Sequence, residues 1–141
     1  MQYPAVVTRE GDVFLIEFPD CPGCQTFTRQ ESAIDSTAAE ALEGWLEVAL
    51  EDGLNPPAPG RPKIPKGAEL RKIRVSSPLA AAIEIRSARK ALKLSQAALG
   101  RMIGISQQAV AKLENGSGNV SLETLEKVAR GLKRDVHIEL V

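Results

Sequence analysis

The sequence predicts an α+β protein with two domains, a small mixed domain over residues 1–76 and an all-helical domain over residues 77–141 that ends in a strand. Two observations predict this class. In the first part, short β-rich runs give way to one long helical pattern and then to a further β-rich run. In the second part, apolar residues recur at intervals of three and four until residue 133. The expected order is therefore βββαβ, followed by helices and a terminal strand.

The first three strands are expected before residue 30. Residues 3–8 and 13–18 are β-rich and flank the turn residues 9–12, which predicts a hairpin. Residues 19–23 contain two prolines and a glycine and predict a second turn. Residues 24–29 then predict the third strand.

A long helix and a returning strand complete the first domain. Residues 31–52 carry an apolar face at helical spacing, and Gly53 ends the pattern. Trp45 lies on that face and is expected in the core. Residues 55–67 contain five prolines and predict no regular structure, whereas residues 68–75 predict a fourth strand. If this strand rejoins the first three, the proline-rich stretch is a loop inside the domain.

The second domain is predicted to contain four helices. The first covers residues 79–92, and the other three begin after the serines Ser95, Ser106 and Ser121, which are favourable N-caps. Residues 135–141 alternate polar and apolar side chains, as a half-buried strand does.

Charge is distributed unevenly although the net charge is zero. Residues 1–55 hold two basic and eleven acidic side chains, residues 56–76 hold six basic and one acidic, and residues 77–141 hold ten basic and six acidic. This asymmetry suggests two partners of opposite sign, such as a basic protein and a nucleic acid, although two solvated surfaces would also explain it. No apolar run is long enough to span a membrane and no signal-peptide pattern follows Met1, so we expect a cytoplasmic protein without membrane contact.

Both cysteines, Cys21 and Cys24, flank a Pro-Gly pair. A redox pair needs a helix N-terminus behind it, and residues 25–28 predict a strand. A zinc site lacks further ligands, since the sequence has one histidine, His137, and no third cysteine. We therefore expect a turn with two incidental thiols, and no metal or cofactor.

The segment 96–114 has the spacing of a helix-turn-helix. Four apolar residues occupy the positions where two short helices face each other, namely Leu99, Ile103, Val110 and Leu113. Gly100 is small where the helices approach closest, Gly104 lies where the turn needs a left-handed backbone, and Ile105 is expected to fill the core from the turn. This agreement predicts a DNA-binding unit.

The side chains left free by this packing define a DNA interface. The candidate DNA-binding residues are Gln96, Ser106, Gln107, Gln108, Lys112 and Asn115. Gln107 and Gln108 lie at the end of the helix that enters the major groove, where a glutamine amide can contact adenine N6 and N7. Lys112 can reach guanine or a phosphate, and Gln96 and Asn115 are placed to hold the phosphate backbone. The alternative is that the two glutamines only solvate an exposed helix.

Residues 83–133 resemble the helix-turn-helix domains of phage repressors. The segments that carry this resemblance are Leu94-Ser95-Gln96, Gly104-Ile105-Ser106-Gln107-Gln108, Leu113-Glu114-Asn115-Gly116 and Leu122-Glu123-Thr124-Leu125. The first half is similar to the HicB antitoxins. Its matching segments are Tyr3-Pro4-Ala5-Val6-Val7, Phe18-Pro19-Asp20, Pro22-Gly23-Cys24 and Leu50-Glu51-Asp52-Gly53, followed by the proline-rich stretch. Cys21 departs from the apolar residue expected at its position.

The resemblance implies a type II antitoxin. In that family the N-terminal domain has a partial RNase H-like fold and covers a small basic mRNA-cleaving toxin of the HicA kind, while the C-terminal domain binds operator DNA and represses the shared operon. The excess of acidic residues over positions 1–55 suits a basic partner independently.

Two other functions compete with this one. A nuclease would need carboxylates converging on two metals, but Asp12 and Asp20 are expected at opposite ends of a strand, with Glu17 near Asp20. The chain is therefore not expected to be an enzyme. A transcriptional repressor whose first domain senses a small ligand, with no toxin partner, is the closer alternative.

The terminal strand is expected to form the dimer interface. Val136, Ile138 and Leu140 share one face, and an unpaired strand with such a face is an edge prone to association. We expect two copies to pair antiparallel and form a DNA-binding dimer, with contacts between N-terminal domains as a route to a tetramer. The alternative is that residues 135–141 join the sheet of the first domain within one chain.

Overall fold

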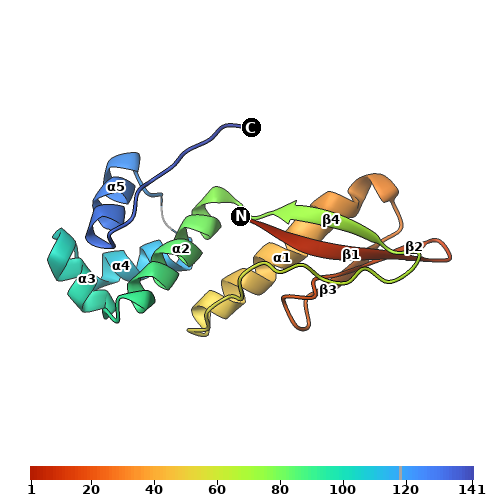
Figure 1. Ribbon diagram of the computed structural model, residues 1–141, viewed down its shortest axis with the longest axis horizontal. Helices are drawn as coiled ribbons and strands as arrows, with labels where there is room; N and C mark the ends of the chain where they lie inside the picture. The colour runs from red at the N-terminus through yellow and green to blue at the C-terminus, as the bar shows by residue number, and fades with distance from the viewer. Residues whose placement is uncertain (118) are drawn as a thin grey trace. The chain divides into compact units, whose positions relative to one another are not determined.

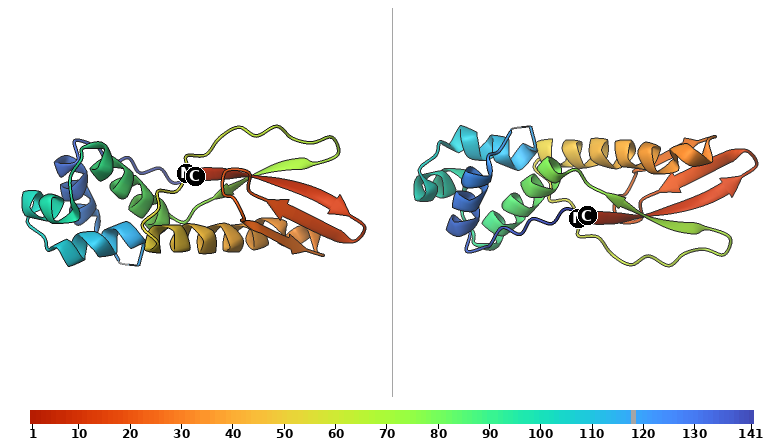
Figure 2. Two further views of the ribbon diagram at one scale, coloured as in Figure 1. Left: turned by 90° about the horizontal axis from the view of Figure 1, so that it is seen from below. Right: turned by 90° about the horizontal axis from the view of Figure 1, so that it is seen from above.

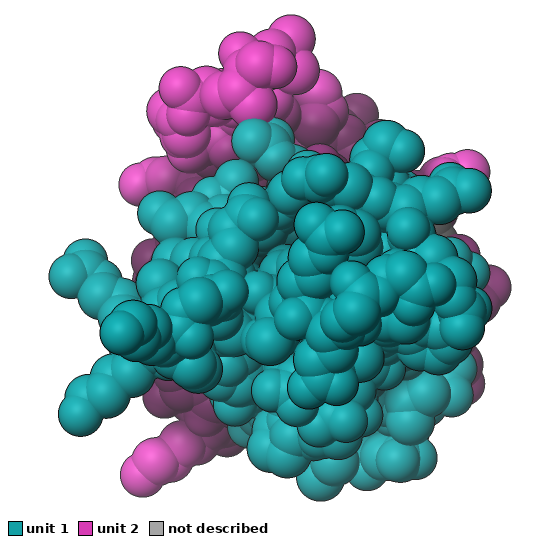
Figure 3. Space-filling view, turned by 90° about the vertical axis from the view of Figure 1, so that its right-hand side faces the viewer, with its two compact units in different colours: residues 1–76 teal, residues 77–141 magenta. Residues whose placement is uncertain are grey.

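The computed structural model describes residues 1–117 and 119–141 and divides the chain into two compact units, residues 1–76 and residues 77–141 (Figure 3). The strands are β1 (Gln2–Glu10), β2 (Val13–Glu17), β3 (Gln25–Thr28) and β4 (Glu69–Arg74). The helices are the short 3-10 helix η1 (Glu31–Ala33) and α1 (Ile34–Glu51), α2 (Ser77–Ala91), α3 (Gln96–Ile103), α4 (Gln107–Asn115) and α5 (Leu122–Gly131), as labelled in Figure 1. The α+β class and the predicted βββαβ order are confirmed.

The first unit is built on a four-stranded antiparallel sheet in the order β3-β2-β1-β4. β1 is a central strand, and its residues from Tyr3 to Val7 are buried on both faces. Helix α1 lies over one face of the sheet, and the segment 54–68 runs along the opposite side (Figure 2). A strand that is covered on both faces has apolar residues at consecutive positions, which explains the sequence Tyr-Pro-Ala-Val-Val.

Helix α1 packs through the apolar face that its spacing predicts. Ile34, Ala38, Leu42 and Leu46 recur every four residues and are at most 1% exposed. Trp45 differs from its predicted core position, because the ring is only half-buried and its indole N–H donates to the carbonyl of Pro22 at 3.0 Å. An indole packs its apolar ring and keeps its N–H beside an acceptor, which the neighbouring turn supplies.

That turn holds both cysteines. The amide of Cys24 donates to the carbonyl of Cys21 at 2.9 Å, and the Cys24 thiol donates to the carbonyl of Ala41 at 3.6 Å. Both thiols are free and buried. Burial, followed by the nearby Cys24 and Asp20, raises the pKa of Cys21 to about 12, and burial also raises the pKa of Cys24. The thiols are protonated at neutral pH, in keeping with the predicted turn.

Two hydrogen bonds anchor the proline-rich loop to the first unit. The hydroxyl of Tyr3 donates to the carbonyl of Pro57 at 2.6 Å, and the amide of Gly60 donates to the carboxylate of Asp20 at 2.9 Å. The stretch is therefore a loop within the unit, and β4 returns to pair with β1. As a consequence, the six basic residues of positions 56–76 belong to the same unit as the acidic residues before them. The net charge of the whole first unit is therefore less negative than the net charge of residues 1–55 alone.

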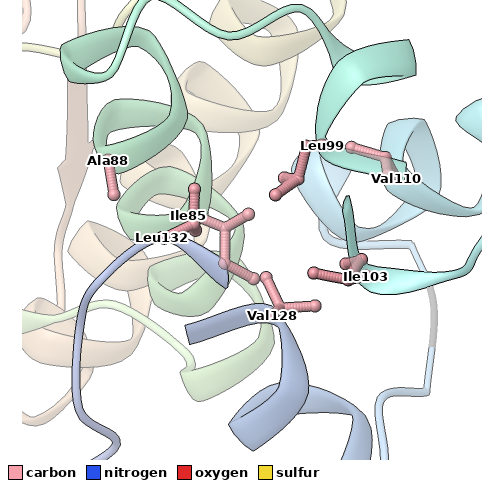
Figure 4. Close-up of a cluster of buried hydrophobic side chains, with 7 residues drawn as sticks. All are labelled: Ile85, Ala88, Leu99, Ile103, Val110, Val128 and Leu132. Carbon is pink, nitrogen blue, oxygen red and sulfur yellow. The ribbon is translucent and has the colours of Figure 1, made fainter. Parts of the chain in front are cut away.

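The helical unit packs around one apolar cluster (Figure 4). Its buried members are Ile85, Ala88, Leu99, Ile103, Val110, Val128 and Leu132. Ile105, Leu113 and Leu125 are partly buried against it. The positions at which the sequence predicts facing helices are thus the positions that pack.

Residues 134–141 form neither a helix nor a strand in the single chain. The sheet of the first unit ends at β4 on one side and at β3 on the other. A segment with alternating side chains becomes a strand only when its backbone groups have a partner.

Among the described helices, none has the length and apolar character required to cross a membrane.

Candidate nucleic-acid interface

The helix-turn-helix is formed by α3, a three-residue turn and α4. Gly104 ends α3 in the left-handed region, at φ 78° and ψ 32°, where a Cβ would be strained. A Cβ at Gly100 would lie 2.6 Å from the carbonyl oxygen of Ile105, so only glycine allows this close approach. The predicted roles of both glycines and of Ile105 in the turn are therefore confirmed.

The N-terminal end of α4 is open to solvent. Gln107, Gln108 and Lys112 are exposed, and within the described residues none of the three side chains has a hydrogen bond or an ion pair. Their amides and ammonium group are therefore available to a ligand. They project from one short helix that the cluster of Figure 4 holds in place through Val110.

Ser106 has a structural role at this end. Its hydroxyl oxygen accepts from the amide of Ala109 at 3.1 Å, so that it caps α4. Ser95 and Ser121 cap α3 and α5 in the same way. Ser106 is thus a candidate DNA-binding residue whose side chain caps and orients the helix that carries the free glutamines.

Gln96 and Asn115 are also engaged within the unit. The Gln96 amide donates to Glu114 Oε1 at 3.3 Å, and Asn115 Oδ1 accepts from the backbone amide of Ser117 at 2.9 Å. Gln96 is half-buried, whereas Asn115 is exposed at the end of α4. The structure therefore separates the six candidates into three free side chains and three that shape the motif.

A buried ion pair joins α2 to α4, and the sequence analysis did not identify it. Arg89 Nε donates to Glu114 Oε2 at 2.6 Å, and Arg89 Nη2 donates to Glu114 Oε1 at 2.8 Å. Arg89 Nη1 donates to the carbonyl of Leu94 at 2.7 Å. Glu114 is 1% exposed and Arg89 is 8% exposed. The hydrogen bonds to Glu114 raise the pKa of Arg89, and the pair fixes α4 against α2.

A sequence signal for this pair exists. Arg89 follows the buried Ile85 by four positions, and Glu114 follows the buried Val110 by four, so both charges lie on apolar helix faces. A charged residue at an inward position is nearly always paired.

The predicted dimer residues differ in exposure in the single chain. Val136 is half-buried, Ile138 is 57% exposed and Leu140 is 95% exposed.

The carboxylates considered for catalysis bind different partners. Asp12 lies 3.8 Å from Arg29, Glu17 accepts from Gln25, and Asp20 accepts from Gly60. Within residues 1–117 and 119–141 no group of three or more His, Cys, Asp or Glu side chains could hold a metal ion.

A comparison with known families matches part of the second unit. Residues 85–137 match the model of a helix-turn-helix family. A solved structure described as a HicA3 and HicB3 toxin-antitoxin complex is 25% identical over 54% of this chain and 99% of that chain, with a TM-score of 0.43. A second, the crystal structure of the antitoxin HicB3, is 23% identical over 75% of this chain and 99% of that chain, with a TM-score of 0.45. The search of curated proteins gave no match. Residues 85–137 form a helix-turn-helix domain.

Proposed function

We propose that this chain is the antitoxin of a type II toxin–antitoxin pair. Its helix-turn-helix domain binds operator DNA and represses the operon, and its first unit binds and masks a small basic mRNA-cleaving toxin of the HicA kind. The chain itself catalyses no reaction and needs no cofactor, because the ribonuclease activity belongs to the partner.

The observation that carries the DNA-binding half is the open end of α4. Gln107 and Gln108 are exposed in the first turn, and Lys112 is exposed one turn later. A helix with two free amides in its first turn presents the donor and acceptor pair that recognises adenine in the major groove. The Arg89–Glu114 pair and the Ser106 cap hold that helix at a defined orientation. The positive balance of residues 77–141 supports phosphate contacts.

The active form on DNA is a dimer. Helix-turn-helix proteins of this type read two half-sites about 34–36 Å apart, which requires two copies. The terminal segment supports this assembly, since Ile138 and Leu140 are exposed apolar residues on one face of an alternating sequence. Pairing of two such segments would satisfy their backbone groups and cover both residues. Contacts between first units then offer a route to a tetramer.

The antitoxin half rests on the resemblance of residues 1–76 to HicB proteins, to which the structure adds a physical basis. The quoted segments occupy defined places in the fold: Tyr3 to Val7 is the buried centre of β1, Pro22 to Cys24 forms the anchored turn, and Leu50 to Gly53 ends α1. The resemblance therefore spans the core of the unit and not only its surface composition.

Two experiments test the proposal separately. For DNA binding, Gln107→Ala and Gln108→Ala should each weaken operator affinity by about 1–3 kcal/mol in a mobility shift with the DNA upstream of the gene. Wild-type affinity in the double variant would refute the assignment of α4. For the antitoxin half, the chain is expressed together with its neighbouring reading frames and purified. Co-purification of a basic protein under about 10 kDa is expected, whereas recovery of the chain alone would favour a repressor without a toxin partner.

A further inference from the structure

The outward face of α1 has properties that the fold of the first unit does not explain. This face consists of Glu40, Glu43, Gly44, Glu47, Val48 and Glu51. At 3.6 residues per turn these six positions fall within an arc of about 140° and extend about 16 Å along the helix. The opposite arc carries the buried residues of the helix. We call these six residues the α1 outer face.

Charge on this face is of one sign and has no internal compensation. Helix α1 contains no lysine or arginine, and among the described residues no ion pair involves Glu40, Glu47 or Glu51. Glu43 accepts a hydrogen bond from the amide of Ser76 at 2.9 Å. Glutamates at intervals of four repel each other along a helix, so that this arrangement opposes helix formation.

The positions of Glu47 and Glu51 increase this cost. Both lie in the last turns of α1, where the helix dipole favours cations and disfavours carboxylates. A face that served only to keep the unit in solution would carry mixed charges, with basic residues near this end. The observed pattern therefore favours positively charged groups supplied by a partner.

Gly44 gives an independent indication. It lies in the middle of an 18-residue helix, its φ is not positive, and a Cβ built on it would meet nothing within 4 Å. The fold therefore does not require glycine here, although glycine is among the poorest helix formers. Val48, one turn further along the same face, is 55% exposed. A bare backbone beside an exposed valine, with carboxylates around both, is a surface that a partner can approach closely.

We infer that the α1 outer face is the docking surface for the basic partner protein, an inference that rests on the proposed function. Lysine and arginine side chains of the partner pair with Glu40, Glu47 and Glu51, and a partner segment packs on Gly44 and Val48. The glutamates supply charge complementarity and fast association, and the small apolar centre supplies close contact.

Paired variants test the docking surface on the full chain, with the co-purified basic protein as the probe. Glu47→Gln/Glu51→Gln removes two charges from the face, and Glu10→Gln/Glu31→Gln removes two exposed charges elsewhere in the same unit. By isothermal titration calorimetry at low salt, we expect the first pair to weaken binding by about tenfold or more and the second pair by less than about twofold. The salt dependence of binding should also decrease only in the first pair.

Gly44→Gln separates docking from folding. Because the position is open and glutamine is a better helix former, this variant should unfold at an equal or higher temperature than the wild type. We nevertheless expect it to bind the probe about tenfold more weakly, because the side chain occupies the approach path. If the wild-type chain binds the probe and both the Glu47/Glu51 and Gly44 variants bind equally well, the docking surface is wrong while the proposed function stands. If no basic protein binds the wild type, the proposed function itself fails.

Discussion

The buried pair between Arg89 and Glu114 allows a quantitative prediction about the helix-turn-helix domain. Arg89→Met keeps an unbranched side chain, although a shorter one, and removes two of the three donors to the Glu114 carboxylate, leaving the 3.3 Å contact from Gln96. Glu114 is 1% exposed, so water cannot replace those donors without opening the helix interface. Breaking a buried pair from one side typically costs about 3–5 kcal/mol.

That cost is comparable with the stability of the whole domain. At about 0.05–0.15 kcal/mol per residue, a unit the size of residues 77–141 has roughly 3–10 kcal/mol in total. Arg89→Met is therefore expected to unfold a large fraction of the domain near physiological temperature and to abolish operator binding. The double variant Arg89→Met/Glu114→Met removes both charges, and it should recover most of the loss, because replacing a buried pair by apolar residues is often neutral or favourable.

Two spectroscopic signals separate the units in the assay. The sequence has one tryptophan, Trp45, in the first unit, so its fluorescence in urea reports on residues 1–76, whereas far-UV circular dichroism also includes the four helices α2 to α5. We expect the fluorescence midpoint to stay constant in all variants. A loss below about 1 kcal/mol in Arg89→Met, or a double variant no more stable than the single one, would refute the reasoning.

Three other predictions concern different parts of the chain. Gly44→Ala should raise the stability of the first unit by about 0.5–1 kcal/mol, because the added Cβ meets nothing. Gly100→Ala should destabilise the second unit, because its Cβ would lie 2.6 Å from a carbonyl oxygen. Thermal unfolding of both variants checks this, and a destabilised Gly44 variant together with a stabilised Gly100 variant would contradict it. The pKa of Cys21 is raised from 9.0 to about 12, so its contribution to stability is full below about pH 9 and is lost as the pH rises toward 12. Urea titrations should show a falling unfolding midpoint over this range, and Cys21→Ala should make that fall smaller. Deletion of residues 135–141 should convert the proposed dimer to a monomer in sedimentation and weaken binding to a palindromic operator. An unchanged sedimentation coefficient would exclude this segment as the interface.

Local patterns predicted the elements of the fold because each depends on neighbours in sequence. The three serine caps, the glycine in the turn and the apolar spacing in α3 and α4 are interactions within about one helical turn, and all are observed. The free state of Gln107 and Gln108 could also be predicted, because nothing in the motif requires their amides.

Interactions between distant residues were harder to predict. Arg89 and Glu114 are 25 positions apart, and a charged side chain on a helix is expected in solvent unless its partner is known. The sequence predicts a phosphate contact for the amide of Gln96, because its contact with Glu114 depends on how α3 meets α4. Trp45 follows the apolar spacing of α1, but its polar N–H places it beside the Pro22 carbonyl at the edge of the core.

The strand order of the first unit has a consequence for synthesis on the ribosome. β1 can pair with β2 as soon as the hairpin emerges, but its other edge pairs with β4, whose residues follow more than 60 positions later. Until Arg74 has left the exit tunnel, the nascent chain therefore presents an open and largely apolar strand. Closing this edge spans a long loop, so it is a slow step compared with formation of the hairpin and of α1. The helical unit follows β4 in the chain, so it is synthesised after the last strand of the sheet.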